Sequence, residues 1–149
     1  MTRTIILNTI LIAGLLASSD LHAGPATAAA QSAAQVTAAD AAPFIGEWTL
    51  DLHSQDGPRT FALVVKVEKE KETVVGEITG TTTGPQPITD VTRSDKSLVL
   101  RYAFDYQGNP VPTVVSLTPA PDNKMNAQID FAGGAYIMSG TATKKEKAK

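Results

Sequence analysis

The chain has 149 residues, of which 42% are hydrophobic, and it carries a formal net charge of −2 and no cysteine. The lack of cysteine excludes disulfides, thiolate catalysis, cysteine metal sites and a lipid attached through cysteine. The small negative charge offers no electrostatic basis for binding nucleic acid.

The first 23 residues have the layout of a cleavable secretory signal. Arg3 supplies the positive charge, residues 5–17 form an almost entirely apolar run, and a small residue, Ala23, follows a short polar stretch. A membrane-spanning helix needs about 20 continuous apolar residues, and this run is shorter. We therefore expect a periplasmic or secreted protein with no integral membrane segment after cleavage. The alternatives are an uncleaved anchor and cleavage at a later alanine such as Ala28.

Residues 24–43 are rich in alanine and contain a single large aliphatic side chain, Val36. Such a segment buries too little apolar surface to offset the entropy lost on ordering. We interpret it as a disordered spacer with transient helix around residues 28–39, since alanine is the best helix former. A tether that holds the following domain away from a membrane or partner is the alternative.

Residues 44–144 consist of short runs in which apolar and polar residues alternate. Turn residues separate the runs at the spacing of roughly 8 to 12 residues that is typical of a β-sandwich or barrel. We expect eight strands, at residues 46–53, 59–68, 72–81, 87–93, 96–106, 111–119, 124–131 and 134–144.

The connections between these strands are short, so sequential neighbours are expected to be antiparallel. Pairing of the first strand with the last would remove the exposed sheet edges. The predicted fold is therefore all-β, an eight-stranded antiparallel up-and-down barrel. The Lys-rich tail at residues 145–149 is expected to fray.

Alternation also assigns an inner face to most strands. In the eighth strand, the set that contains Ile137 competes with the set that contains Tyr136 and Met138 for the inside. Thr and Gly weaken the alternation at residues 72–81 and 87–93. The expected inner residues of the better-defined strands are Trp48, Leu50, Leu52, Phe61, Leu63, Val65, Val67, Leu98, Leu100, Tyr102, Phe104, Met125, Ala127, Ile129 and Phe131.

No constellation of residues predicts a reaction. His53 lies beside Ser54 and Asp56, but a catalytic triad is normally assembled from separated elements, so we interpret His53 as a solvated turn residue. The other carboxylates form no paired or metal-binding pattern. We expect a protein that is not an enzyme, with no catalytic residue, metal or cofactor.

The aromatic residues expected inside the barrel are the one feature that points to binding: Trp48, Phe61, Tyr102, Phe104 and Phe131. Eight-stranded barrels are at the size where the interior either is filled by side chains or holds one small ligand. One hypothesis is a non-catalytic exported module that binds a small apolar molecule in the interior. The other is a structural or protein-interaction barrel with a packed core from Trp48 to Phe131 and an unknown partner.

Residues 44–48, Phe-Ile-Gly-Glu-Trp, resemble the F-x-G-x-W opening of the calycin barrels, which include lipocalins, fatty-acid-binding proteins and avidins. Residues 46–144 are similar to a lipocalin-like domain of exported bacterial proteins. Gly76, the Phe-Asp-Tyr-Gln-Gly turn at 104–108 and the Met-Ser-Gly-Thr run at 138–141 carry this resemblance.

The resemblance implies a small β-barrel that binds apolar ligands and performs no reaction. The chain departs from these families in several ways. It lacks a helical lid after the first strand, and it is shorter than true lipocalins and lacks their C-terminal helix. The basic residue that packs on the tryptophan in lipocalins corresponds only loosely to Lys144 or Lys145.

Overall fold

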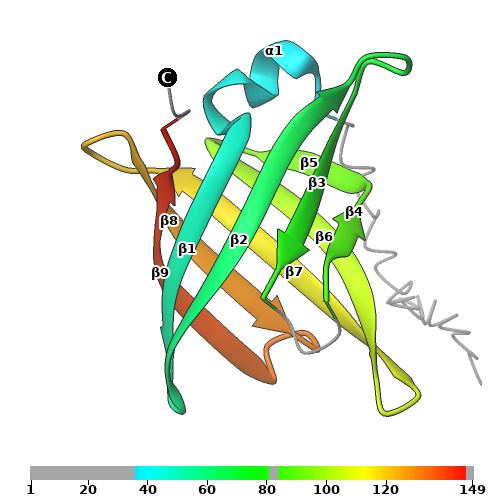
Figure 1. Cartoon of the computed structure of the whole chain (residues 1–149), viewed down its shortest axis with the longest axis vertical. Helices are drawn as coiled ribbons and strands as arrows, with labels where there is room; N and C mark the ends of the chain where they lie inside the picture. Colours follow the sequence, from blue (N-terminus) through cyan, green and yellow to red (C-terminus); the bar gives the residue numbers. More distant parts are fainter. Residues whose placement is uncertain (1–35, 81–83, 147–149) are drawn as a thin grey trace, which may run out of the picture. The chain divides into compact units, whose positions relative to one another are not determined.

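The computed structural model describes residues 36–80 and 84–146. The expected signal, the spacer up to residue 35, Thr81 and the last three residues of the tail lie outside the described residues. The described chain forms one antiparallel sheet that nearly closes into a barrel (Figure 1). This confirms the predicted all-β, up-and-down barrel.

The barrel has nine strands rather than the expected eight. The strands are β1 (Gly46–Ser54), β2 (Gly57–Glu68), β3 (Thr73–Thr79), β4 (Gln86–Ile88), β5 (Asp90–Ser94), β6 (Ser97–Tyr106), β7 (Asn109–Pro119), β8 (Lys124–Phe131) and β9 (Tyr136–Lys144). β8 has the predicted bounds, and the ends of the other strands either coincide with the prediction or differ from it by a few residues.

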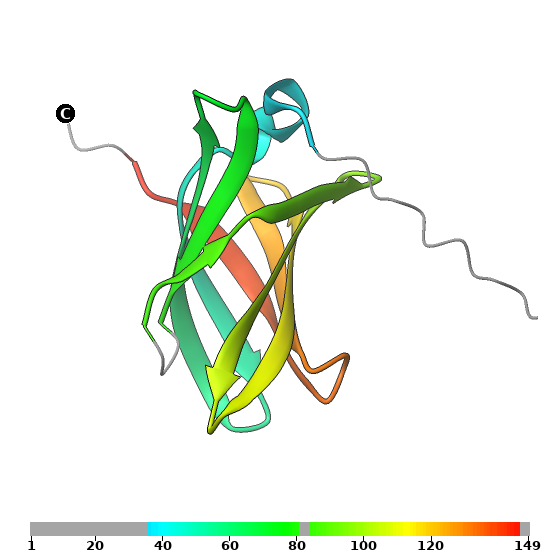
Figure 2. The same ribbon diagram turned by 90° about the vertical axis from the view of Figure 1, so that its right-hand side faces the viewer.

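The additional strand arises because the run predicted at residues 87–93 divides at Thr89. β4 pairs with β3, whereas β5 pairs with β6, so the chain changes neighbours between them. Ile88 and Val91 are both buried although they are three positions apart, and an uninterrupted strand cannot place them on one face. The result is a seam between β4 and β5, which Figure 2 shows facing the viewer.

Pairing between the first and last strands closes the barrel on the other side. β1 pairs with β2 along its whole length and with β9 from Trp48 to His53. At Gly140 an added Cβ would collide with the Asp51 carbonyl oxygen, so β9 can lie this close to β1 only without a side chain there. Gly140 therefore permits the closest approach between the two strands that seal the sheet.

The inner faces follow the predicted alternation. On β1, Leu50 and Leu52 are fully buried, and Leu100 on β6 and Ile129 on β8 are buried equally deeply. The ambiguity in the last strand is resolved in favour of the set with Met138, which is buried, while Ile137 is 46% exposed. All of these buried residues belong to one hydrophobic core cluster, from which Ile137 is absent.

A short helical segment closes the end of the barrel at which β1 begins (Figure 1). It consists of α1 (Ala38–Ala41) and η1 (Ala42–Phe44), and we call residues 36–44 the lid and this end the lid end. Val36, Ala41 and Phe44 are buried in the core cluster. Residues 36–43, which the sequence placed in the spacer, are therefore packed against the barrel.

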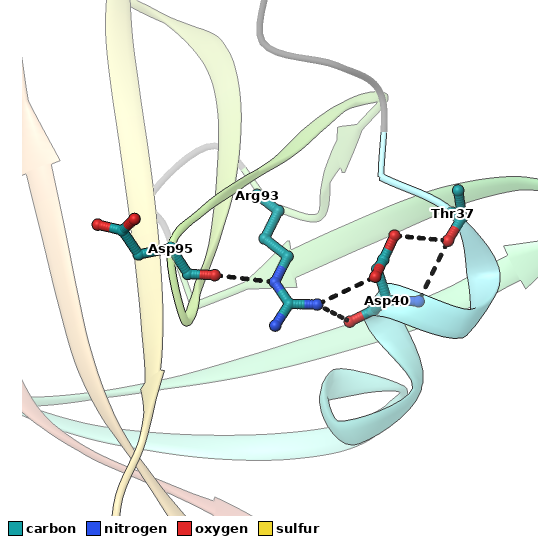
Figure 3. A network of polar contacts seen from close by, with 4 residues as sticks. All are labelled: Thr37, Asp40, Arg93 and Asp95. Carbon is teal, nitrogen blue, oxygen red and sulfur yellow. Dashed lines mark hydrogen bonds and ion pairs between the residues drawn. The ribbon is translucent and has the colours of Figure 1, made fainter.

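Polar contacts hold the lid to β5 beside the seam (Figure 3). Thr37 caps α1 by accepting a hydrogen bond from the Asp40 amide at 3.2 Å. The Arg93 guanidinium lies 3.2 Å from the Asp40 carboxylate and also donates to the Asp95 carbonyl oxygen at 3.0 Å. The Val36 amide donates to the Val91 carbonyl oxygen at 3.4 Å, so the lid also uses the free edge of β5.

Candidate functional site

Four aromatic rings from three strands contact one another at the end opposite the lid. We call Tyr102, Phe104, Phe131 and Tyr136 the aromatic row, and the end formed by the β1–β2, β6–β7 and β8–β9 turns the hairpin end. Neighbouring ring centroids are 6.4, 6.1 and 6.0 Å apart. Phe104 and Phe131 meet edge to face at 88°, an arrangement favoured by the ring quadrupoles.

The row forms because β7 places a small residue between its larger neighbours. Tyr102 lies opposite Thr113, and Thr113 in turn lies opposite Phe131. The side chain of Thr113 is buried and short, so the rings from β6 and β8 can meet across it. Tyr136 then lies opposite Phe131 on β9 and extends the row toward β1.

All four rings of the aromatic row are only partly buried, unlike the core residues above them. Tyr102, Phe131 and Tyr136 pack against the core cluster. The row therefore forms the floor of the hairpin end, with one side on the core and the other accessible to solvent.

The Tyr102 hydroxyl is buried and makes no hydrogen bond of ordinary geometry within the described residues. Desolvation raises the pKa of Tyr102 to about 12, and the Thr113 hydroxyl on the opposite strand offsets only part of that effect. A buried hydroxyl normally finds a partner, because leaving it unpaired costs about 1–3 kcal/mol. Within the described residues, the Tyr102 hydroxyl is an exception to this rule, with Thr113 beside it but no hydrogen bond of ordinary geometry.

The Tyr136 hydroxyl fixes the other end of the row. It lies 2.6 Å from Ser54 Oγ and 2.8 Å from the Asp56 carboxylate, so its single proton is held between two acceptors. Asp56 also donates its amide to Ser54 Oγ at 3.2 Å. These contacts join the β8–β9 hairpin to the β1–β2 turn. Ser54 and Asp56, the polar residues beside His53, therefore have a structural role in this turn.

Three of the five residues expected to bind a ligand, Tyr102, Phe104 and Phe131, belong to the aromatic row. Phe61 is 5% exposed and is part of the core cluster. Trp48 is buried at the lid end, where its indole Nε1–H donates to the Phe44 carbonyl oxygen at 2.7 Å. The row therefore excludes Trp48.

Lys144 covers the outer side of the Trp48 ring, with Nζ 5.4 Å from the ring centroid. Gly46 has φ 141°, and an added Cβ would lie 2.6 Å from Lys144 Cε. The Gly-x-Trp spacing thus leaves room for a lysine over the tryptophan. The role that the resemblance implied for a basic residue near the chain end corresponds in position to Lys144.

Tyr136 is the member of the row that the sequence did not identify. Its inward orientation depended on which face of the last strand is inside, and alternation alone left that choice open. The only sequence signal is that Tyr136, Met138 and Ala142 are the larger set of apolar residues at a spacing of two.

The core between Trp48 and the aromatic row is continuous. Side chains with no exposed surface come from eight different strands, and they form one cluster that Phe131 contacts. On the strands, the fully buried set consists of Leu50, Leu52, Leu63, Val74, Ile78, Ile88, Leu98, Leu100, Val115, Leu117, Ile129 and Ala142.

Within residues 36–80 and 84–146, no group of three or more His, Asp or Glu side chains is placed to hold a metal ion. Nor does this part of the chain contain a helix that is long and apolar enough to cross a membrane. Searches of protein-family models, curated proteins and solved structures found no match for the chain.

Proposed function

We propose that this protein is a non-catalytic binding module that holds a small apolar molecule on the aromatic row at the hairpin end. The single observation that carries the proposal is the row itself, four rings in which each contacts the next and each is only partly buried. Such rings offer a large apolar contact area at low entropic cost. The proposal also retains the expected export and the expected lipocalin-like fold, and the antiparallel barrel is compatible with that fold.

The continuous core restricts where such a ligand would lie. Packed side chains occupy the space between the row and Trp48, so a deep position would require displacement of buried leucines. A ligand at the row meets no such barrier, because all four rings are partly exposed. We therefore place the ligand at the hairpin end rather than in the middle of the barrel.

The test is a titration of the purified protein with N-phenyl-1-naphthylamine, a neutral apolar fluorophore. The proposal predicts saturable fluorescence enhancement with about one site per chain. Phe131→Ala removes the central ring and should weaken binding by roughly tenfold or more, since a buried aromatic contact of this kind is worth on the order of 1–3 kcal/mol.

Ile137→Ala is the matched control. Ile137 lies on the same hairpin as Phe131 but is exposed on the outer face, so its loss should leave the titration unchanged. Absence of saturable binding in the wild-type protein, or equal weakening by the two variants, would reject the proposal.

The second candidate is a structural or protein-interaction barrel that binds no small molecule. The continuous core from Trp48 to Phe131 favours it, because that packing is what a solid barrel requires. Failure of the fluorophore to bind would leave this candidate.

A further inference from the structure

The outer surface of the barrel contains a polar hollow that the proposed function does not use. It has a volume of about 380 Å³ and lies over β7, β8 and β9, on the opposite side of the sheet from the core. This volume is within the range of small-molecule sites. The residues that line it are Ser116, Thr118, Asn126, Ala127, Gln128, Ser139 and Gly140, and we call this set the outer hollow.

Strand pairing arranges the side chains of the outer hollow in two rows across the sheet. Gln128 lies between Ser116 and Ser139, and Asn126 lies between Thr118 and Thr141. Neighbouring strands are about 4.8 Å apart, so each amide has a hydroxyl on either side at that spacing. The pattern offers hydroxyl and amide groups over an area several strands wide.

No ionisable side chain lines the outer hollow. Charged side chains flank the hollow without lining it: Lys124 and Asp130 share the outer face of β8 with the two amides, and Asp51 lies opposite Thr141 on β9. A charged ligand would meet charges of both signs at this rim and no opposite charge in the lining to offset its lost hydration. The lining therefore favours a neutral ligand.

Most of the hydrogen-bonding groups in the outer hollow make no hydrogen bond to other described residues of the protein. Thr118 contacts the Ser97 hydroxyl at 2.7 Å, but within the described residues the side chains of Asn126, Gln128, Ser116 and Ser139 have no hydrogen bond. Each amide can donate and accept at the same time. Such a pair of functions matches two adjacent hydroxyl groups on a ligand.

An exposed apolar side chain flanks the outer hollow. Ile137 is 46% exposed and is one of two large apolar residues with this degree of exposure in the described chain. It shares the outer face of β9 with Ser139, two residues away. A sugar ring has hydroxyl groups at its edge and apolar C–H groups on its faces. The polar rows can bind the hydroxyl groups, and Ile137 can contact a C–H face.

We propose that the outer hollow is a binding site for a neutral glycan. The amides of Asn126 and Gln128 bind vicinal hydroxyls, the flanking serines and Thr118 add further hydrogen bonds, and Ile137 contacts a C–H face. The site is separate from the aromatic row, which lies on the inner face of β6, β8 and β9, so the two proposals stand or fall independently.

The test is a titration of the ¹⁵N-labelled protein with maltotetraose, cellotetraose, chitotetraose and mannotetraose, followed by NMR. At least one of these neutral tetrasaccharides should shift the side-chain amide signals of Asn126 and Gln128 saturably at concentrations up to about 10 mM. Tetragalacturonate, which is anionic, should bind more weakly than that sugar.

The double variant Asn126→Ala and Gln128→Ala should weaken binding of that sugar by roughly tenfold or more, because it removes two amides that each contribute hydrogen bonds. Gln55→Ala removes an exposed amide from the β1–β2 turn and should have no effect. The proposal is overturned if none of the four neutral sugars shifts the two amide signals, if the anionic sugar binds best, or if the double variant binds like the wild type.

Discussion

At the scale of residues, one hydrogen bond links the lid to the first strand: the Trp48 indole donates to the Phe44 carbonyl oxygen at 2.7 Å. Gly46, between them, has a backbone conformation that side chains rarely adopt and leaves space for Lys144. These contacts give a physical reason for the spacing of Phe44, Gly46 and Trp48. The sequence suggested this opening through its resemblance, but the partner of each residue depends on the register of β1 with β9.

Gly140→Ala should destabilise the fold strongly. The new Cβ would collide with the Asp51 carbonyl oxygen, which belongs to the backbone and cannot rotate away. We expect a loss of at least about 2 kcal/mol in the free energy of unfolding, measured by urea denaturation. Ser139→Ala, at the neighbouring exposed position, should cost less than about 0.5 kcal/mol. Equal stability of the two variants would show that β9 does not approach β1 this closely.

The raised pKa of Tyr102 predicts a loss of stability in alkali. Burial favours the neutral phenol, with a pKa of about 12 against 10.0 for a tyrosine in water. Between these values the unfolded chain releases the proton while the folded chain keeps it, so stability is complete below pH 10 and falls as the pH rises toward 12.

Tyr102→Phe should reduce this alkaline loss, as measured by urea unfolding at several pH values between about 8 and 11.5. It should not destabilise the protein at neutral pH, because it removes a buried hydroxyl that makes no hydrogen bond of ordinary geometry within the described residues. An unchanged pH dependence would contradict the environment described for Tyr102. A large loss of stability at neutral pH would indicate that the hydroxyl is paired.

At the level of elements, the lid combines a buried aromatic anchor with an exposed ion pair. Phe44 is 1% exposed, whereas Arg93 and Asp40 have side chains that are 39% and 53% exposed. Exposed ion pairs contribute about 0–1 kcal/mol, and a buried phenylalanine contributes several times more. The packing of Phe44 should therefore hold the lid, while Arg93 chiefly sets its orientation.

Two variants test this division. Phe44→Ala should lower the free energy of unfolding by about 3–5 kcal/mol, and Arg93→Gln by less than about 1 kcal/mol. Urea denaturation measures both. Added salt should reduce the difference between Arg93→Gln and the wild type, because it screens the ion pair. A cost for Arg93→Gln as large as that for Phe44→Ala would mean that the polar network holds the lid.

Most strands could be predicted because apolar and polar residues alternate clearly, as in β6 and β8. The seam could not, because Ile88 and Val91 read equally well as one irregular strand until their different partners, β3 and β6, are known. The sequence predicts a disordered spacer where the lid lies, for a related reason. Its alanines bury little surface alone, and only contact with the barrel accounts for the burial of Val36 and Ala41.

For the molecule as a whole, the two ends of the barrel differ in chemistry. The lid end is closed by buried Phe44 and Trp48, and the hairpin end presents the partly exposed aromatic row. The five aromatic residues predicted from the sequence were all inward-facing, but alternation does not tell how far along the barrel each lies. The position of a residue along the barrel depends on the register between strands. This register places Trp48 at the lid end and Tyr102, Phe104 and Phe131 at the hairpin end.

The measurement that tests the central claim most directly is the aromatic ¹H–¹³C NMR spectrum of the protein during titration with N-phenyl-1-naphthylamine. A ligand on the aromatic row should shift the ring signals of Phe104, Phe131 and Tyr136 saturably and leave those of Trp48, at the lid end, unchanged. Ring signals that stay constant throughout, or a Trp48 signal that shifts together with them, would contradict a binding site at the hairpin end.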